Sequence, residues 1–245
     1  MRRYFYDLHI HSCLSPCGDD DNTPNNIVGM AVLCGLDIVA LTDHNTSKNC
    51  PAFFEAAKRH NIIPIAGMEL TTSEDIHVVC LFENLEDAMR FDDYIDENRV
   101  KIKNKPGIFG NQTVLDANDE PVCEIESLLI NATGISISDV SDTVASFGGI
   151  CYPAHIDREA NGVIAVLGSL PEDTSFNLYE LNDRANIDEY SVLYGIPAER
   201  FIISSDAHYL TDMRDKENYF EIEDEPQDTS LIRSRLFEIL RRQGK

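Results

Sequence analysis

The sequence predicts one α/β barrel domain that occupies all of residues 1–245. Strand-like apolar runs alternate with helical segments over roughly the first hundred residues, which is typical of a parallel sheet with crossover helices. A chain of this length can bury one large core, and α/β barrels of this size are commonly single domains. Most of the apolar runs are followed directly by histidines and carboxylates, which suits a barrel that gathers its functional residues at the carboxyl ends of its strands.

The first half of the chain contains four predicted strands and three predicted helices. Thr23 and Pro24 open the first helix, with Thr23 as its N-cap and Pro24 at the first helical position. Gly35 ends that helix, since glycine adopts the left-handed conformation at a helix C-terminus without strain. The predicted strands cover residues 4–10, 37–42, 62–66 and 77–82, and the other two helices cover residues 51–61 and 85–99.

Residues from about 100 to 135 interrupt this alternation, and we interpret them as an insertion into the barrel that is too short to be a separate domain. The segment begins with a basic turn, Lys101–Lys105, and residues 108–123 have the turn residues of a small hairpin. Two short helices are expected at residues 124–131 and 138–147. The alternation then resumes, with strands expected at residues 150–154, 176–181, 201–205 and 219–222, and helices at residues 187–194 and 228–242.

The composition excludes several classes of protein. No apolar run approaches the roughly 20 residues that are needed to span a bilayer. The formal net charge is −23, and such a chain repels the backbone of nucleic acids unless bound cations reverse the charge locally. There is also no basic groove with interleaved aromatic residues and no tryptophan. We therefore expect no membrane and no long nucleic acid as a partner, whereas the sequence does not indicate an oligomeric state.

The seven cysteines are scattered in odd number, which does not indicate a disulfide framework. Cys34, Cys80 and Cys151 fall in apolar runs and are expected to be buried thiols. The N-terminus leads directly into a strand-like segment, and no secretory signal is visible. A reducing cytoplasm is the expected location. Cys13 and Cys17 differ from the others, because they follow the first pair of histidines.

Six of the seven histidines lie in short clusters, and almost every cluster also contains a carboxylate. Neutral imidazoles and carboxylates that converge from several strand ends are the ligands of polynuclear metal sites. Only His60 lies outside this pattern, in the last turn of a predicted helix. The clustered segments are Asp7-Leu-His9-Ile-His11, Thr42-Asp43-His44, Gly67-Met-Glu69, Ile76-His77, Ala154-His155 and Ser205-Asp206-Ala-His208.

Each of these clusters is weak evidence when it is taken alone, because Thr, Ser and Asp commonly begin loops and a His-x-His pair can be solvated or satisfied in a core. Their coincidence at five strand ends is strong evidence, since burying so many polar groups together without a metal would leave costly unpaired atoms. His77 fits less well, because it lies near the start of its predicted strand. The loop Thr71–Asp75 would have to return to the top of the barrel for His77 to join the site.

Taken together, these segments resemble the motifs of the PHP (polymerase and histidinol phosphatase) family. The matching motifs span residue 5 to about residue 210, and the set is specific. The resemblance implies a distorted (β/α)7 barrel with two or three divalent metal ions, zinc, manganese or iron, and hydrolysis of phosphoesters. Histidinol phosphatases, nucleotide phosphatases, short-RNA exonucleases and proofreading domains of polymerases belong to this family.

The resemblance also implies a trinuclear metal centre and a partition of its ligands. Glu69 would bridge the first ion and the second ion. Asp43 would orient His44 rather than bind metal, as carboxylates behind metal-bound histidines do. The first ion would be held by His9, His11, Glu69 and Asp206, the second by Glu69, His77 and His155, and the third by His44 and His208.

The sequence departs from the family pattern at one position. A histidine or an aspartate usually follows the first motif histidine by seven or eight residues as a ligand of the third metal, and here Pro16 and Cys17 occupy those positions. Cys17 is one candidate ligand, and a thiolate would favour zinc. The alternatives are that Asp19, Asp20 or Asp21 supplies the ligand, or that the third site is incomplete.

A metal-activated hydroxide is the expected nucleophile, bridging the ions held by Glu69, because metal ions lower the pKa of bound water and stabilise the charge that develops on a phosphoryl group. Arg158 and Arg184 are candidate phosphate contacts, although either could form an ordinary salt bridge instead. Lys48 is a weaker candidate, and Glu180 and Asn182 could support the site from the adjacent strand end.

A small phosphomonoester, a nucleotide or a very short oligonucleotide is the expected substrate. Two other classes of function remain open on the sequence. One is a metal-stabilised regulatory module with weakened catalysis, which the unusual Cys17 would suit. The other is an amidohydrolase-like enzyme that cleaves C–N bonds, although the metal-binding lysine of many such enzymes has no evident counterpart here.

Overall fold

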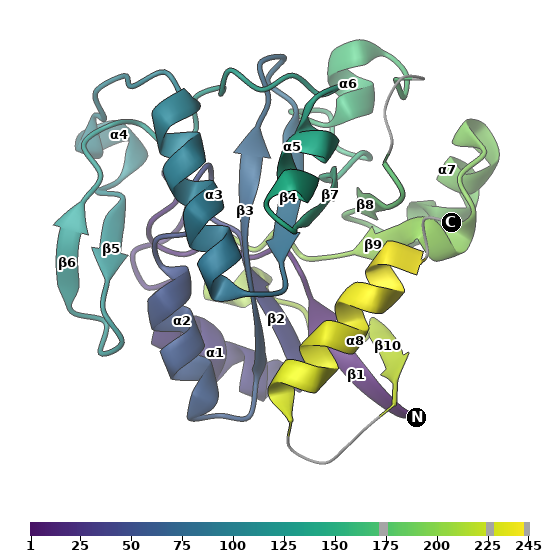
Figure 1. The fold of residues 1–245 in the computed structure, drawn as a ribbon, viewed down its shortest axis with the longest axis horizontal. Helices are drawn as coiled ribbons and strands as arrows, with labels where there is room; N and C mark the ends of the chain where they lie inside the picture. The colour runs from purple at the N-terminus through teal and green to yellow at the C-terminus, as the bar shows by residue number, and fades with distance from the viewer. Residues whose placement is uncertain (172–175, 224–227, 243–245) are drawn as a thin grey trace.

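A computed structural model describes residues 1–171, 176–223 and 228–242 (Figure 1). Its main sheet is mixed and six-stranded, with the order β10-β1-β2-β3-β4-β7. The strands of this sheet are β1 (Arg2–Asp7), β2 (Ile38–Leu41), β3 (Ile63–Thr71), β4 (His77–Phe82), β7 (Ile150–Pro153) and β10 (Tyr219–Ile222). Two smaller sheets pair β5 (Thr113–Leu115) with β6 (Pro121–Glu124) and β8 (Tyr179–Leu181) with β9 (Phe201–Ile203).

Seven of these strands form an incomplete barrel. It is closed by backbone contacts that lie beyond the ends of β1, β7 and β9. The end of β7 reaches β8 through the Ile156 amide, which donates to the Glu180 carbonyl at 2.9 Å. On the other side, Ile10 and Ala207 form a parallel bridge beyond the ends of β1 and β9. The ring therefore runs β1-β2-β3-β4-β7-β8-β9, and β10 pairs with the outer edge of β1. The expected distorted α/β barrel is confirmed as a half-barrel.

The sheet is not wholly parallel, which corrects one expectation from the sequence. β1, β2 and β3 are parallel, whereas β4 runs antiparallel to β3 and β7 runs antiparallel to β4. β3 and β4 are joined by a short hairpin instead of a crossover helix, so β4 starts at the end of the barrel where β3 finishes. Thr71 pairs with His77 in this register. This reversal removes the difficulty with His77, whose position at the start of a strand places it at the top of the barrel.

The helices cover the outside of the sheet and mostly follow the predicted boundaries. Thr23 caps α1 by accepting a hydrogen bond from the Asn26 amide, and Gly35 ends the helix with φ +72°. The expected helix at residues 124–131 is wrong, because Glu124 still belongs to β6 and the residues after it form a loop. The helices are α1 (Pro24–Cys34), α2 (Cys50–Lys58), α3 (Leu85–Asn98), α4 (Pro106–Phe109), α5 (Val140–Ser146), α6 (Val163–Leu167), α7 (Ile187–Tyr194) and α8 (Thr229–Arg242).

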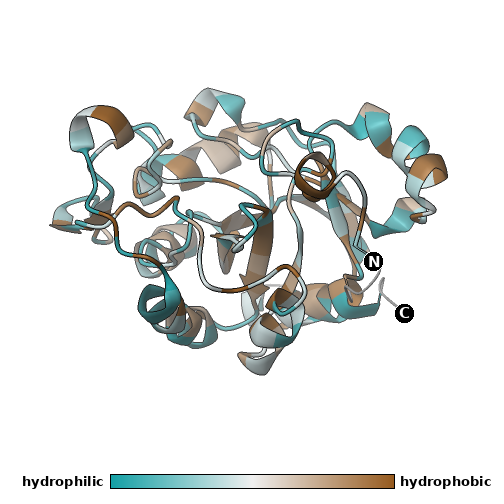
Figure 2. Ribbon diagram, turned by 90° about the horizontal axis from the view of Figure 1, so that it is seen from above, coloured by the Kyte–Doolittle hydropathy of each residue, from teal (hydrophilic) through white to brown (hydrophobic). Residues whose placement is uncertain are grey.

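The strands are buried on both faces, which explains their continuous apolar sequences. On one face, α1, α2, α3 and α5 pack against side chains such as Val39 and Leu41. On the other face, α8 contributes Leu236 and Phe237 to a second cluster that contains Ile38 and Ala40. Seen from above, the apolar strands lie inside a ring of helices and more polar loops (Figure 2). Two packed faces hold the strand ends rigidly, which a precise arrangement of functional side chains requires.

The inserted segment forms the predicted hairpin, β5–β6, and lies beside α2 and α3 (Figure 1). Asn49 fastens it to the barrel, because its side chain accepts from the Leu115 amide at 2.9 Å and donates to the Thr113 carbonyl at 3.3 Å. Leu14, Val114 and Leu129 form a small apolar cluster beneath it. The hairpin thus buttresses the loop that follows the first two histidines.

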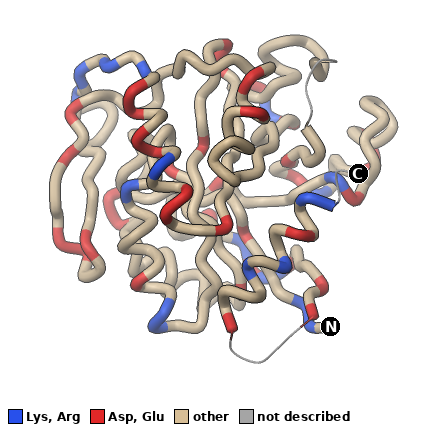
Figure 3. Tube along the Cα trace, in the orientation of Figure 1, with Lys and Arg blue, Asp and Glu red and all other residues tan. Residues whose placement is uncertain are grey.

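Acidic residues are spread over the helices and the hairpin, and the lysines of the basic turn lie next to α4 (Figure 3). Several cations in this region are already paired, as Lys101 is with Asp96 at 2.7 Å. Among the residues that the structure describes, no helix is both long enough and apolar enough to cross a bilayer.

Candidate metal centre

Six histidines and two carboxylates meet in one cluster at the end of the barrel where the parallel strands finish and the antiparallel β4 begins. Neighbouring imidazole rings lie 4.2–6.2 Å apart between centroids. Each of these residues except His208 is at most 7% exposed. The histidines are His9, His11, His44, His77, His155 and His208, and the carboxylates are Glu69 and Asp206.

Four of these residues, His9, His11, Glu69 and Asp206, form a first group with the spacing of ligands around one ion. His9 Nε2 and His11 Nε2 are 3.1 Å apart, and Asp206 Oδ1 lies 3.3 Å from the former and 3.2 Å from the latter. The Glu69 oxygens lie 3.4 Å from His9 Nε2 and 3.3 Å from His11 Nε2. Ligands about 2.0–2.2 Å from a tetrahedral ion are roughly 3.3–3.6 Å apart. The separations of 3.1–3.4 Å in this group are close to that spacing.

Glu69 presents both of its oxygens to imidazoles on different sides. Oε1 lies 2.8 Å from His77 Nδ1 and 3.1 Å from His155 Nε2, in addition to its contact with His9. Oε2 lies 3.1 Å from His44 Nδ1 as well as near His11. The carboxylate therefore stands between two groups of donors, which is the position of a bridging ligand. The second group of mutually close donors is His44, Glu69 and His77, with His155 on the same carboxylate oxygen.

A third group contains His11, Cys17, His44 and His208. Cys17 Sγ lies 3.2 Å from His44 Nε2. The structure thus places Cys17 among the histidines, while none of the three aspartates that follow it joins a donor group within the described residues. Asp19 instead accepts a hydrogen bond from the Asp21 amide in its own loop.

Hydrogen bonds to the rear nitrogens orient several of the imidazoles. His9 Nδ1 lies 2.9 Å from Glu180 Oε2, and His208 Nδ1 lies 2.8 Å from the Asp206 carbonyl. His11 Nδ1 lies 2.9 Å from Ser15 Oγ. In His9 and His11, Nε2 then faces Glu69 and Asp206, which is how metal-binding histidines are usually fixed.

Asp43, which the sequence suggested as a support for His44, contacts two serines in the structure. Its oxygens accept hydrogen bonds of 2.7 Å from the Ser12 amide and hydroxyl and from the Ser15 hydroxyl. Asp43 therefore supports His11 through Ser15. The two serines escaped notice in the sequence, because a hydroxyl next to a metal-binding motif has no distinctive spacing.

Two residues of the centre have a strained backbone. His155 has φ +27° and Asp206 has φ +53°, both in the left-handed region that side chains with a Cβ avoid. Such conformations cost about 1–3 kcal/mol each and persist where the surrounding structure fixes them. His155 lies two residues beyond the end of β7 and Asp206 lies three residues beyond the end of β9, and both side chains face the cluster.

The electrostatics of the cluster fit bound cations. Burial alone would raise the pKa of Glu69, but the neighbouring imidazoles of His77, His9 and His44 hold it well below its ordinary value. Burial lowers the pKa of His44, which favours the neutral, ligating form. Among the described residues, His44 Nδ1, His155 Nδ1 and Asp206 Oδ1 are buried without a hydrogen bond of acceptable geometry. Buried polar atoms normally have partners, and divalent ions would supply them for His44 Nδ1 and Asp206 Oδ1, which face the other donors. His155 instead turns its other nitrogen, Nε2, toward Glu69.

The cations that the sequence suggested occupy different positions. Arg158 Nη1 lies 2.5 Å from Asp206 Oδ2, and its side chain is 44% exposed, so it borders the centre and remains accessible. Arg184 donates to Asn218 Oδ1 at 2.5 Å, and Lys48 pairs with Asp92 at 2.5 Å. Asn182 donates to the Ser205 carbonyl at 3.0 Å and so supports the strand end that carries Asp206.

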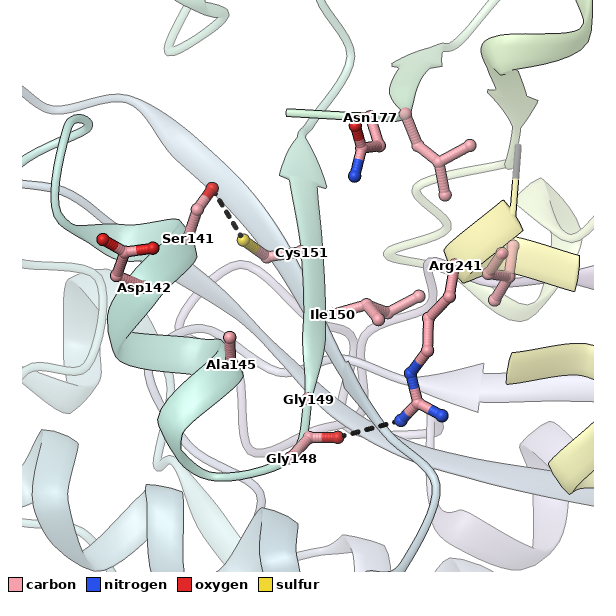
Figure 4. A pocket seen from close by; sticks show the side chains of 11 residues that line it. Ser141, Asp142, Ala145, Gly148, Gly149, Ile150, Cys151, Asn177 and Arg241 are labelled. Carbon is pink, nitrogen blue, oxygen red and sulfur yellow. Dashed lines mark hydrogen bonds between the residues drawn. The ribbon is translucent and has the colours of Figure 1, made fainter. Parts of the chain in front are cut away.

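A separate pocket of about 490 Å³ lies between α5, the start of β7 and α8 (Figure 4). It is lined by residues such as Ser141, Cys151 and Arg241, and Arg241 donates to the Gly148 carbonyl at 3.2 Å. None of its described lining residues belongs to the cluster, and it opens at the start of β7 whereas His155 follows the end of that strand. The histidine cluster is the candidate functional site, because the chemically versatile side chains gather there.

Comparison with known proteins agrees with this arrangement. Residues 7–136 match the model of the PHP domain family. The matched segment covers more than half of the chain and contains His9, His11, His44, Glu69 and His77. The chain therefore belongs to the PHP domain family, and it carries a buried, histidine-rich site of the kind that holds several metal ions.

The individual relatives are distant and are mostly larger proteins. A PolC-type DNA polymerase III of Thermotoga maritima is 36% identical over 87 residues, which cover 36% of this chain and 6% of that protein. A lesion-specific endonuclease of Pyrococcus furiosus has a TM-score of 0.64 at 17% identity, covering 95% of this chain and 56% of the other. An amidohydrolase of Chromobacterium violaceum, with bound sulfate and no metal, has a TM-score of 0.61 at 17% identity, covering 97% and 96%. The matched regions span half or less of the curated relatives' length.

Proposed function

We propose that the protein hydrolyses a phosphoester with the help of two or three divalent metal ions. The observation that carries this proposal is the position of Glu69, whose two oxygens face imidazoles of separate donor groups. Divalent ions lower the pKa of a coordinated water and neutralise phosphoryl oxygens, and paired ions about 3.5–4 Å apart stabilise both attacking and leaving oxygens. A bridging carboxylate is the ligand that holds two ions so close together.

The protein's own residues would have distinct tasks in this reaction. His9, His11, Glu69 and Asp206 would hold one ion, and His77 and His155 would complete the site of a second around Glu69. Glu180 would keep His9 in the orientation that points Nε2 inward. Ser15 and Asp43 would do the same for His11.

Arg158 would bind the substrate phosphate. Its guanidinium borders the centre and is partly exposed, so it can contact an anion without leaving its place. A guanidinium donates two parallel hydrogen bonds to phosphoryl oxygens, which positions them as well as attracting them. Arg184 is the weaker candidate, since its guanidinium already donates to Asn218 Oδ1.

The proposed substrate is small: a phosphomonoester, a nucleotide or a very short oligonucleotide. The strong negative charge of the chain opposes a long polyanion, whereas one phosphate needs to meet only the ions and Arg158. Proteins of similar fold include an endonuclease and an amidohydrolase, so longer DNA and simple amides belong among the compounds to be tested.

The test is a screen of the protein loaded with manganese or with zinc. Phosphate release would be measured from phosphomonoesters, nucleotides and 5′-phosphorylated dinucleotides, and amide cleavage would be measured in parallel. We expect release from at least one phosphoester that disappears with a chelator and in His11→Ala. His60→Ala is the matched control, because His60 is exposed and lies outside the centre. No metal-dependent release from any phosphoester would overturn the proposal, and amide cleavage alone would favour a C–N hydrolase.

A further inference from the structure

The third donor group is the part of the centre that contains sulfur. Cys17 Sγ lies 3.2 Å from His44 Nε2, and the donor atoms of Cys17, His44, His11 and His208 all lie within 4.8 Å of one another. His11 and His44 are buried, whereas Cys17 is exposed. Cys17 is therefore the most exposed member of this donor group.

The loop that carries Cys17 is held in place by its own backbone. The Gly18 amide donates to the Ser15 carbonyl at 2.9 Å, and the Asp19 amide donates to the His208 carbonyl at 2.9 Å. A Cβ on Gly18 would lie 2.2 Å from the Ser12 carbonyl oxygen, so the chain passes itself too closely for any other residue. These contacts hold the backbone on both sides of Cys17 in place next to His208. The short distance between Cys17 Sγ and His44 Nε2 therefore follows from the fold of the loop.

The hydrogen bonds decide which nitrogens are available to a third ion. His11 Nδ1 is engaged by Ser15, so His11 has one free nitrogen, Nε2, which already faces the first group. His208 Nδ1 is engaged by the Asp206 carbonyl, which leaves its Nε2 for a metal. His44 uses Nδ1 toward Glu69 and Nε2 toward Cys17. Three ligands remain for a third ion: one thiolate and two imidazoles.

We propose that Cys17 is the ligand that completes the third metal site beside His44 and His208, and that its thiolate makes this site select zinc over manganese and magnesium. Thiolate and imidazole are ligands that zinc prefers, whereas manganese and magnesium prefer oxygen. Three protein ligands leave the fourth position of a tetrahedral ion open, which is the arrangement of a zinc ion that takes part in chemistry. This proposal rests on the metal-dependent function above and assigns a ligand type and a metal to one part of that centre.

Metal content and a spectrum test the proposal without relying on turnover. The protein would be saturated with zinc, freed of excess and analysed by mass spectrometry of its metals. We expect Cys17→Ser to retain one zinc equivalent less than the unmodified protein. With cobalt in place of zinc, the unmodified protein should show a thiolate-to-cobalt charge-transfer band in the near ultraviolet, and Cys17→Ser should lack it.

Cys123 provides the matched control, because it is the other exposed thiol and lies on the β5–β6 hairpin. Cys123→Ser should keep both the zinc content and the band. Cys17→Asp should regain the lost zinc equivalent without the band, and its third site should discriminate less strongly against manganese.

An unchanged zinc content and band in Cys17→Ser would overturn the proposal, as would loss of the band in Cys123→Ser alone. If Cys17→Ser lost all bound metal and also its folded circular-dichroism spectrum, the decision would rest on Cys17→Asp. Failure of Cys17→Asp to regain the lost zinc equivalent would also count against a ligand at this position. A protein that shows the band but hydrolyses no phosphoester would contradict the proposed function and leave the zinc site standing.

Discussion

Glu180 illustrates how a residue outside the ligand set can control the centre. It is fully buried, and its Oε2 atom contacts His9 Nδ1 and accepts a hydrogen bond from the His155 amide. The carboxylate thereby contacts two histidines from different strands, His9 after β1 and His155 after β7. An amide of the same shape retains the hydrogen-bonding oxygen but loses the negative charge that makes the imidazole a stronger ligand.

We expect Glu180→Gln to weaken metal binding by about 10–100-fold, which is typical when a partner behind a metal-binding histidine is removed. Competition with a chromogenic chelator measures this affinity. Glu189→Gln on α7 changes the charge equally at an exposed position and should have no effect. Equal affinities in Glu180→Gln and the unmodified protein would exclude Glu180 from a supporting role.

His11 makes metal binding depend on pH. Burial alone would lower its pKa, but hydrogen bonds with Asp206 and Glu69 raise it to about 9 from an ordinary 6.5. Without metal, His11 therefore carries a proton at neutral pH, and a metal ion must displace that proton. We expect zinc binding at pH 7 to release at least one proton, which calorimetry detects as a dependence of the binding heat on the buffer.

The same group affects the stability of the metal-free protein. Because the pKa of His11 is higher in the folded protein than in the unfolded chain, protonated His11 stabilises the fold fully below pH 6.5. This contribution is lost as the pH rises through about 9. We expect the melting temperature of the metal-free protein to fall across this interval more steeply than that of His11→Ala. Parallel pH profiles for the two proteins would contradict the assignment of the proton to His11.

At the scale of elements, the β3–β4 hairpin is the part on which the centre depends most. β3 delivers Glu69 and the reversed β4 delivers His77, so any displacement between the two strands separates a carboxylate from its imidazole. Gly67 permits their close approach, because a Cβ there would lie 2.5 Å from the Cys80 carbonyl oxygen. Glycine is required at this point for space, since its φ is not in the left-handed region.

We expect Gly67→Ala to destabilise the protein by about 1–3 kcal/mol, as overpacking usually does, and to weaken metal binding. Denaturant unfolding measures the first effect. Gly29→Ala is the matched control, because it lies inside α1 with nothing within 4 Å of the added Cβ. There the same change should stabilise the protein by roughly 0.5–1 kcal/mol. If Gly67→Ala left the free energy of unfolding unchanged, the hairpin would have relaxed to accommodate the added Cβ.

For the whole molecule, the cluster joins segments from residue 9 to residue 208, so bound ions would tie the barrel together. Ions at about 1,000 times their dissociation constant would add roughly 4 kcal/mol to the free energy of unfolding. For a domain of this size, 1 kcal/mol corresponds to about 2–4 °C in melting temperature. We therefore expect a chelator to lower the melting temperature by roughly 8–16 °C, as measured by calorimetry.

A variant without the bridging carboxylate provides the comparison for this effect. Glu69→Ala removes the carboxylate shared by the first and second donor groups, so a chelator should lower its melting temperature by much less. A chelator effect of equal size in Glu69→Ala and in the unmodified protein would place the stabilising ions elsewhere.

Local signals in the sequence determined much of the fold. Thr23, Pro24 and Gly35 predicted both ends of α1, because capping depends on atoms only a few residues apart. The apolar runs predicted most strands, since burial on both faces leaves an uninterrupted apolar pattern. The polar residues that follow those runs predicted which histidines and carboxylates meet, because strand ends share one edge of a barrel.

Tertiary structure decided the features that depend on pairing between distant segments. The reversal of β4 follows from a hairpin that looks like any other loop in the sequence, yet it alone brings His77 to the centre. Asp43 reaches the ring of His11 through Ser15, a contact that forms only when the loop is folded. The sequence by itself identified a histidine-rich centre and left Cys17 and the aspartates as alternatives. Only the folded loop placed the Cys17 sulfur beside His44, because its backbone is fastened to His208.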